Sequence, residues 1–312
     1  MVLNYSDMKK NESIFRGFTG VTVEEFEELE RKAEPIWVEK EKKRLARKER
    51  MREEGGGRNQ ALDFQNQLLM TLVWMKLYLV LNALGYLFGV DKSSASRYIA
   101  RMRVVLREVG EETLGWPEQE RRGHGRKLEQ IWGENPDRFA YVDATEQRIQ
   151  RSKNKEQQKK DYSGKKKAHT RKTQIVVNED GVVRDVSLST EGSMHDRKHF
   201  THSGVSEKIP TETIVAGDLG YQGIQHDLPD HSVITPFKNS KHHPLTDEQK
   251  LLNQEFSSGR IIVENTIAQF KHFDILSHRF RHSVDIYDDV FRSVLAIVNP
   301  RLQNRLSSAS TA

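Results

Sequence analysis

Three carboxylates lie in segments where an isolated charge is unusual. Asp143 lies inside the apolar run "AYVDAT", Asp218 follows the apolar run in "IVAGDLG", and Glu264 lies in the middle of "GRIIVENTIAQFKHF". An ionised carboxylate among apolar strand neighbours is costly unless its pKa shifts, a basic side chain pairs with it, or a cation binds it. Capping of a turn, or pairing with a lysine, would explain either aspartate taken alone.

Taken together, the three carboxylates have the chemistry of a metal-dependent site. Two aspartates from neighbouring strands and one glutamate from a helix packed over the strand ends would supply oxygen ligands for a hard cation such as Mg²⁺. Two such ions, roughly 3.5–4 Å apart, activate a nucleophile and stabilise the leaving oxygen in phosphodiester cleavage. Asp143, Asp218 and Glu264 are therefore candidate catalytic residues and metal ligands.

The segment around Glu264 is predicted to be a helix, because its apolar residues recur at helical spacing. Arg260 precedes Glu264 by four residues and Lys271 follows it by seven, so all three fall on one stripe. This stripe is either an ordinary solvated face or one side of a site assembled from distant parts of the chain.

Residues 137–312 are expected to form an α/β domain. Strands are predicted at "RFAYVDAT", "TIVAGDLGY" and "SVITPF", and "TQIVVNEDGVVRDVSL" reads as a hairpin around an Asp-Gly turn. Helical segments are predicted to begin at "GSMHDRKHF" and "TDEQKLLNQEF". This succession predicts a mixed sheet flanked by helices.

The segment from Ser193 to Asp196 allows two interpretations. Its spacing resembles a capping box, with Ser193 as the cap of a helix and Asp196 at the third helical position. The alternative places His195 or Asp196 behind the metal ligands, as residues that support them. Histidines at helical spacing raise the possibility of zinc, but twelve scattered histidines without any cysteine argue against a dedicated zinc site.

Residues 61–115 are predicted to form a helix-turn-helix domain. A strong helix at "FQNQLLMTLVWMKLYL" is followed by a shorter one at "VLNALGYLFGV" that Gly89 closes. Asp91 or Ser93 can then cap "SSASRYIARMRVVLREVG", a helix rich in small polar and basic residues. Its outward side chains could contact phosphates or base edges: Lys92, Ser93, Ser94, Ser96, Arg97 and Arg101. A plain three-helix bundle is the alternative.

The remaining N-terminal segments carry weaker signals. Residues 1–60 are expected to form a charged helical arm, with one or two exposed helices ended by Gly55–Gly57. An oligomerisation arm, a DNA-contacting arm and a lid are all compatible with that pattern. Residues 116–136 contain Trp116-Pro117 and Asn135-Pro136 and are expected to be a linker.

Charge and composition limit the classes of partner. The chain of 312 residues has a net charge of +5 and a pI near 9.2, and the run from Arg151 to Lys172 concentrates lysine and arginine. Such a run is either a solvated loop or a contact surface for a polyanion. No apolar run reaches the roughly 18–20 residues of a membrane span, and the N-terminus lacks the order of a secretory signal. An intracellular protein with no membrane partner is therefore expected.

Six ordered motifs resemble one family. "YVDATE", "YSGKKKAHT" followed by "KTQ", "GSMHD", "GDLGYQG", "ITPFK" and "RIIVEN" with a later "FK" occur in the order seen in transposases of the insertion-sequence-five family, which are related to Harbinger-like transposases. The match covers roughly 138–299, and the helix-turn-helix upstream is similar to the one those enzymes carry.

The resemblance implies a ribonuclease-H-like core with a DDE triad, carried here by Asp143, Asp218 and Glu264. Arg260, Glu264 and Lys271 also fit the wider group's pattern of Tyr, Arg, Glu and Lys, but Ser257 occupies the tyrosine position. In such a core the cluster of Lys165, Lys166 and Lys167 would lie beside the active site, where a phosphate backbone must pass.

The expected function is that of a DNA transposase. Its helix-turn-helix would bind terminal inverted repeats, and its core would hydrolyse a phosphodiester and then join the 3′-hydroxyl to target DNA. Two Mg²⁺ ions, with Mn²⁺ as a possible substitute, and a homodimer on double-stranded DNA are implied, in the cytoplasm and at the nucleoid of a prokaryote. Two alternatives stay open: a transposase-derived DNA-binding regulator without cleavage activity, and a nuclease that performs no strand transfer.

Overall fold

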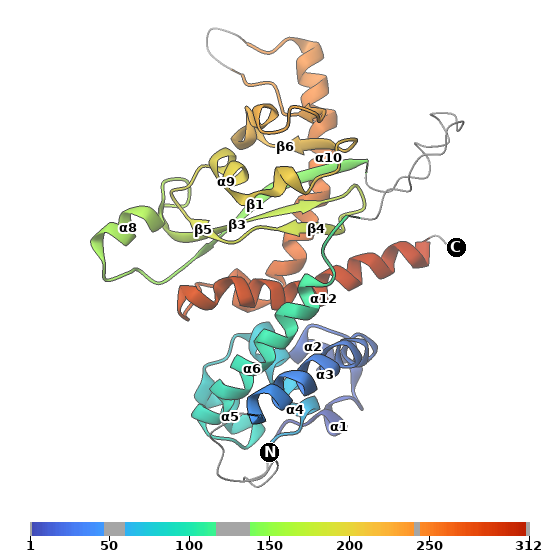
Figure 1. Ribbon diagram of the computed structural model, residues 1–312, viewed down its shortest axis with the longest axis vertical. Helices are drawn as coiled ribbons and strands as arrows, with labels where there is room; N and C mark the ends of the chain where they lie inside the picture. Colours follow the sequence, from blue (N-terminus) through green and yellow to red (C-terminus); the bar gives the residue numbers. More distant parts are fainter. Residues whose placement is uncertain (1, 47–59, 117–137, 240–243, 310–312) are drawn as a thin grey trace. The chain divides into compact units, whose positions relative to one another are not determined.

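The structure is a computed structural model that describes residues 2–46, 60–116, 138–239 and 244–309 (Figure 1). The chain divides into two compact units, and each is described by itself. The helical unit comprises Met1–Thr113, Phe270–His278 and Asp285–Arg301. The sheet unit comprises Leu114–Gln269, Arg279–Val284 and Leu302–Ala312. Within the described ranges, no helix is both long and apolar enough to cross a membrane.

The N-terminal segment of the helical unit is packed, which corrects the expectation of an exposed arm. It contains α1 (Tyr5–Met8), α2 (Glu12–Thr19) and α3 (Val23–Leu45). Phe26 stacks on Tyr5 with ring centroids 4.8 Å apart, and Phe15 packs edge-on against both rings. Thr22 and Glu25 form a capping box at the start of α3, and α3 packs on the helices that follow. The predicted glycine stop at 55–57 lies outside the described residues.

The expected helix-turn-helix lies in the same unit, as α4 (Phe64–Leu77), α5 (Leu81–Phe88) and α6 (Lys92–Glu111). Gly89 ends α5 with φ 66°, in the left-handed region where glycine is favoured. Asp91 rather than Ser93 caps α6, because its carboxylate accepts hydrogen bonds from the backbone amides of Ser93 and Ser94. The predicted inward residues of α6 are buried: Ile99, Met102 and Leu106.

Segments near the C-terminus complete the helical unit. They are α11 (Asp274–Ser277) and the part of α12 (Tyr287–Ala309) up to Arg301. Arg301 of α12 donates two hydrogen bonds to the carboxylate of Glu25, at 2.7 and 2.8 Å. Arg292 of α12 lies so close to α6 that a methyl group on Gly110 would overlap its carbonyl oxygen. The sequence placed these segments in an α/β domain running to residue 312; their contacts group them with the helix-turn-helix.

The sheet unit is built around β1 (Phe139–Arg148). On one side β1 pairs antiparallel with β3 (Ala168–Val177), and on the other side it pairs parallel with β6 (Ile214–Gly217). β7 (Val233–Ile234) extends the sheet in parallel beyond β6. The short strands β2 (Tyr162–Ser163), β4 (Val183–Val186) and β5 (Thr190–Glu191) all pair antiparallel with β3. The predicted hairpin turn contains Gly181 at φ 82°.

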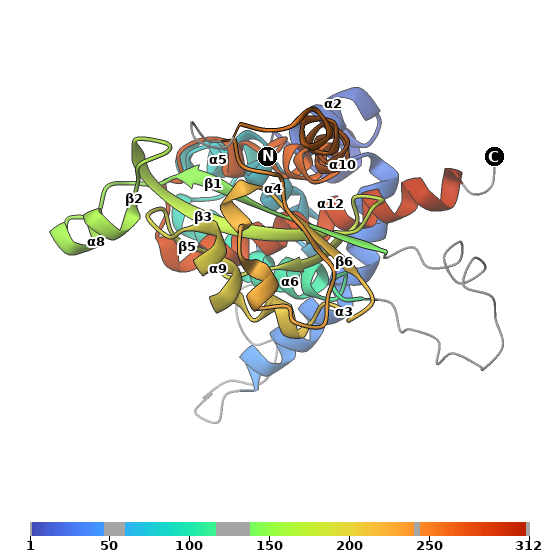
Figure 2. The same cartoon turned by 90° about the horizontal axis from the view of Figure 1, so that it is seen from above.

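Helices cover both faces of this sheet, as Figure 2 shows. α9 (Asp196–Ser203) buries Phe200 in a core with Ala140 and Val142 of β1. α10 (Asp247–Lys271) approaches the opposite face, where Gly259 lies against Tyr141. α8 (Lys155–Asp161) leads into β2, and short 3-10 turns follow α9 and β6. The predicted mixed sheet flanked by helices, with the strand pattern of a ribonuclease-H-like core, is thereby confirmed.

The close contact of α6 with α12 yields a stability prediction. Gly110→Ala should lower the free energy of unfolding by about 1–3 kcal/mol, because the added methyl has no space against α12. Gly17, in α2, has no atom within 4 Å of an added methyl. Gly17→Ala should therefore raise the stability by about 0.5–1 kcal/mol through helix propensity. Thermal or urea unfolding of both variants is the measurement, and equal shifts in the two variants would contradict the packing of α12 on α6.

Candidate functional site

The register of two neighbouring strands brings Asp143, in the middle of β1, and Asp218, just after the end of β6, together. β1 and β6 run parallel, and Val142 of β1 is the register partner of Gly217 of β6. Asp143 and Asp218 each follow that pair by one residue. Neighbouring parallel strands lie about 4.8 Å apart, so the sequence-predicted aspartates occupy adjacent positions at one edge of the core.

The surroundings of Asp143 disfavour its ionised carboxylate. Its side chain is 17% exposed, and its Oδ1 accepts a hydrogen bond of 2.7 Å from the amide of Ala144. Burial raises the pKa of Asp143, the charges of Asp218 and Asp196 raise it further, and the Ala144 amide and Arg260 oppose the rise. A carboxylate in this position gains from any cation that can reach it.

Asp218 is oriented by its own backbone. It caps the short helix η2 (Leu219–Tyr221), and its Oδ1 accepts a hydrogen bond of 2.8 Å from the amide of Gly220. β6 has ended at Gly217, so the carboxylate projects from the end of the strand and is half-buried. One of its two oxygens is therefore directed by the turn that follows the strand.

Glu264 lies on α10, the helix that passes close to β1. That helix comes close to β1 at Gly259, where an added methyl would lie 2.9 Å from the Tyr141 hydroxyl. One residue later, the Nη2 of Arg260 lies 3.5 Å from Asp143 Oδ2 and 3.5 Å from Glu264 Oε1. Arg260 thus bridges the first and third members of the predicted triad, and the Glu264 side chain is 59% exposed.

The donor set suits a divalent cation, although the carboxylates are spread out. Among the residues that the structure describes, no three acidic or histidine side chains are close enough to hold one metal ion. Asp143 and Asp218 offer hard oxygen atoms on adjacent strands, and their repulsion favours a cation between them. The Glu264 side chain is 59% exposed, and its Oε1 and Asp143 Oδ2 both lie 3.5 Å from the same Arg260 nitrogen, so Glu264 stays near this pair of aspartates.

The capping-box interpretation of Ser193–Asp196 is wrong. The cap of α9 is His195, whose side chain makes no capping hydrogen bond, and Asp196 is the first helical residue. His195 is exposed. Asp196 is half-buried and its Oδ1 accepts a hydrogen bond of 2.7 Å from the Nζ of Lys172. The negative charge of Asp196 also raises the pKa of Asp143.

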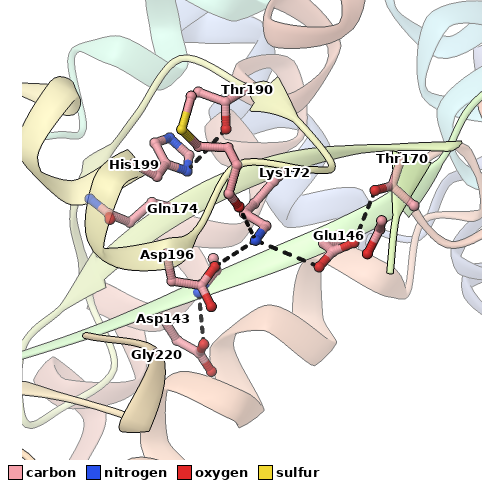
Figure 3. A network of polar contacts seen from close by, with 12 residues as sticks. Asp143, Glu146, Thr170, Lys172, Gln174, Thr190, Asp196, His199 and Gly220 are labelled. Atoms are coloured by element: carbon pink, nitrogen blue, oxygen red, sulfur yellow. Dashed lines mark hydrogen bonds and ion pairs between the residues drawn. The ribbon is translucent and has the colours of Figure 1, made fainter. Parts of the chain in front are cut away.

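Sequence reasoning missed three residues that lie around the carboxylates. Buried Lys172 on β3 and half-buried Glu146 on β1 are register partners, and Figure 3 shows the Lys172 ammonium between Glu146 and Asp196. Tyr221 is fully buried, and its hydroxyl has no hydrogen-bond partner in the part of the chain that the structure describes. A lysine inside the β-rich run "TRKTQIVV" was the one available signal, because a charge there needs a buried partner.

The predicted DNA-contacting residues of α6 differ in exposure. Lys92, Ser93, Ser96 and Arg97 are exposed. Ser94 is half-buried, since its hydroxyl donates to Asp91 Oδ2 at 2.6 Å and accepts from Arg97 Nη2 at 3.1 Å. Arg101 lies 3.7 Å from Glu41 of α3 and its side chain is 30% exposed. Four of the six are thus fully presented to a partner.

The lysine cluster of Lys165, Lys166 and Lys167 is exposed in the turn between β2 and β3. Asp143 pairs with Ile175, eight residues after Lys167. At about 3.3 Å per residue, the cluster lies roughly 25 Å from Asp143 along the strand. That is farther than the sequence suggested.

Two predicted positions on α10 remain. Lys271 is exposed in the last turn of α10, two turns beyond Glu264, and it groups with the helical unit. Ser257 is exposed one turn before Arg260, and its hydroxyl donates to the carbonyl oxygen of Asn253 at 2.7 Å. Unlike the tyrosine of the family pattern, Ser257 has no aromatic ring that could stack on a DNA base.

Known proteins resemble both units. Residues 142–299 match the profile of the DDE superfamily endonucleases, and residues 60–112 match the helix-turn-helix of DDE superfamily endonucleases. A probable transposase for insertion sequence element IS702 from Microchaete diplosiphon is 31% identical over 228 residues, which cover 72% of this chain and 76% of the relative. No solved structure matches the chain.

The two matched ranges contain the three carboxylates and the three helices of the helix-turn-helix. The first begins one residue before Asp143 and includes Asp218 and Glu264, and the second spans α4 to α6. Membership of the insertion-sequence-five subgroup stays a prediction. The chain belongs to the DDE superfamily of endonucleases and carries the helix-turn-helix of that superfamily, as a DDE transposase does.

Proposed function

We propose that this protein is a DNA transposase that binds the terminal inverted repeats of its element, hydrolyses a phosphodiester at each end and joins the freed 3′-hydroxyl to target DNA. The observation that carries the proposal is the pairing of Val142 with Gly217, which places Asp143 beside Asp218. The contacts of Arg260 with both Asp143 and Glu264 support a role for the third carboxylate.

Asp143, Asp218 and Glu264 would hold two Mg²⁺ ions, for which Mn²⁺ could substitute. When bound, such ions activate the attacking oxygen and stabilise the leaving oxygen. The chain's own residues position the DNA: Arg260 would leave the carboxylates and bind a phosphate near the scissile bond, with Lys271 farther along the strand. His195 and Asp196 would support the ligands from α9.

Recognition of the element end would fall to α6. Its exposed side chains fit contacts with phosphates and base edges in a major groove. Ser94 and Arg101 would contribute less than Lys92 and Arg97, because they are half-buried whereas Lys92 and Arg97 are exposed. Lys165, Lys166 and Lys167 would contact the backbone about seven base pairs from the cleaved bond, given roughly 3.4 Å per base pair.

Transposition requires the two ends of the element to be brought together, so the protein is proposed to act as a homodimer on double-stranded DNA. It is proposed to act at the nucleoid, in the cytoplasm of a prokaryote. The proposed division of function assigns end binding to residues 1–115 and catalysis to 137–312, with a linker at 116–136; within the second range, Phe270–His278 and Asp285–Arg301 belong structurally to the helical unit. Inverted repeats flanking the coding region favour an active element. A DNA-binding regulator would bind such an end without cutting it, and a simple nuclease would cut without joining.

Replacing a triad carboxylate should abolish cleavage. Asp218→Ala is expected to lower the rate of Mg²⁺-dependent nicking of an inverted-repeat end by about 10³-fold or more, since metal electrostatics carries most of the rate. Asp230→Ala is the control, because Asp230 is an exposed carboxylate of the same unit. Gel analysis of end-labelled DNA measures cutting, and a joining assay measures strand transfer. Equal cutting by wild type and Asp218→Ala would show that the triad is misassigned.

Replacing an exposed basic residue of α6 should weaken end binding. Arg97→Ala is expected to lower the affinity for the repeat about tenfold, or about 1.4 kcal/mol, and to reduce the slope of log affinity against log salt by about one if Arg97 binds a phosphate. Lys32→Ala, which removes an exposed lysine of α3 paired with Glu28, is the control. Fluorescence anisotropy at several salt concentrations measures both quantities. Unchanged binding by Arg97→Ala would place the DNA elsewhere.

The raised pKa of Asp143 predicts a stability that depends on pH. Because the folded-state pKa exceeds the unfolded one, ionised Asp143 disfavours the fold at neutral pH, and this cost vanishes below both pKa values. Without divalent cations, Asp143→Asn should therefore melt above wild type at about pH 7, with the gap shrinking toward about pH 4. Asp230→Asn should show no such trend. A wild type that melts above Asp143→Asn at about pH 7 would contradict the prediction.

A further inference from the structure

An exposed aromatic side chain of the sheet unit has no role in the reaction described so far. Phe237 follows β7, and its side chain is 45% exposed. Its backbone is held on both sides by the side chain of Asn253 on α10. The Asn253 amide oxygen accepts a hydrogen bond of 2.8 Å from the Phe237 amide, and its nitrogen donates one of 3.0 Å to the Phe237 carbonyl oxygen. A ring on a fixed backbone loses little freedom on binding, so it is suited to contact a ligand.

Phe237 lies at the same edge of the sheet as Asp218. β7 runs parallel to β6, and Ile234 of β7 is the register partner of Ala216 of β6. Asp218 follows Ala216 by two residues, and Phe237 follows Ile234 by three. The two segments stay together past the strand ends, because Gln222 donates a hydrogen bond of 3.4 Å to the carbonyl oxygen of the proline before Phe237. At the spacing of neighbouring strands, the backbone of Phe237 is within about 10 Å of that of Asp218.

One stripe of α10 connects Phe237 with the carboxylates. Asn253 precedes Ser257 by four residues and Arg260 follows Ser257 by three, so these three residues share one face of the helix. Asn253 holds Phe237 at one end of the stripe, and Arg260 contacts Asp143 at the other. At 1.5 Å per residue the two ends are about 10 Å apart along the helix. Because Ser257 has no ring, Phe237 supplies an aromatic ring beside this stripe.

DNA bound at the carboxylates would bring its bases to Phe237. About 10 Å corresponds to roughly three base-pair steps of 3.4 Å. Inside a duplex both faces of a base are covered by neighbouring bases, so a protein ring can stack only on a base that has left the stack or on the last base of an end. Every base has a π-face, so such stacking is tolerant of sequence. The exposed ammonium of Lys238, the next residue, suits the adjoining phosphate.

We propose that Phe237 stacks on a nucleobase that leaves the duplex within about three base pairs of the cleaved bond, and that Asn253 is the positioning residue that holds Phe237 there. The inference rests on the proposed DNA-cleaving function and adds a contact to a base, which the carboxylates and Arg260 do not make. Stacking on Phe237 offsets part of the cost of unpairing that base, so DNA that is already unpaired at this place needs the ring less.

Photocrosslinking to 5-iodouracil tests the contact directly. The probe is an inverted-repeat end in which 5-iodouracil replaces one base at a time on either side of the cleaved bond, bound to the full chain without divalent cations so that no cutting occurs. Long-wavelength light couples this base to an aromatic ring stacked on it, and peptide mapping locates the product. One position should crosslink to Phe237, and Phe237→Tyr should keep that crosslink while Phe237→Ala loses it. A wild type that crosslinks at no position through Phe237 would overturn the proposal.

Cutting of paired and mismatched ends measures what the contact contributes. Phe237→Ala should lower the rate of Mg²⁺-dependent cutting of the fully paired end by about tenfold, and a mismatch at the crosslinked base should restore most of that rate. Asn253→Ala should show the same rescue together with a weaker crosslink. Leu251→Ala is the matched control, because Leu251 is a 57% exposed apolar residue on another face of α10. It should cut both ends like wild type. Equally slow cutting of both ends by Phe237→Ala would contradict a role in stabilising an unpaired base.

The outcomes separate this inference from the proposed function. If wild type cuts the end while Phe237 crosslinks to no base, this inference alone fails. If wild type neither binds nor cuts the end, the proposed function fails and this inference fails with it. The other possible occupant of the ring is a second copy of the chain. If Phe237→Ala turns a dimer into a monomer in sedimentation without DNA, and cuts paired and mismatched ends alike, the ring belongs to an interface between copies and the proposal is wrong.

Discussion

The parallel pairing of β1 with β6 is the constraint on which the rest of the site depends. It aligns Val142 with Gly217 and so brings Asp143, in the middle of β1, next to Asp218, which follows the end of β6. Their repulsion, together with burial of Asp143, makes the site unfavourable for the fold and favourable for cations. The surrounding elements then offset that cost. Arg260 supplies positive charge from α10, and Lys172 supplies it from β3.

Two glycines set how closely the charged groups approach. Gly259 lets α10 pass close to Tyr141, which brings Arg260 between Asp143 and Glu264. Gly220 lets Asp196 approach Asp218. In the proposed reaction, Arg260 and a divalent cation would compete for the same carboxylates, so metal binding would favour release of Arg260 from them.

The sequence alone predicted the triad residues as candidates, the mixed sheet and the helix-turn-helix with buried Ile99, Met102 and Leu106. The predictions of the sheet and of the helix-turn-helix rest on local rules, namely strand alternation, helical periodicity and capping, whereas the triad was assigned through the family resemblance. The errors came from contacts between distant segments. Residues of α3 were read as an exposed arm, although Phe26 is buried against Tyr5 and Phe15. The helices after α10 were assigned to the α/β domain, although Arg301 binds Glu25.

What the sequence by itself determined is the chemistry available: three carboxylates in apolar or helical settings, a basic second helix and a family resemblance carried by ordered motifs. Only the tertiary structure decided which charges share a site. Asp196 has local spacing that mimics a helix cap, yet its partner is Lys172 on a strand 24 residues earlier. Pairings of that kind depend on strand register and on where a neighbouring strand ends, and both are set by packing across the whole sheet rather than by local sequence.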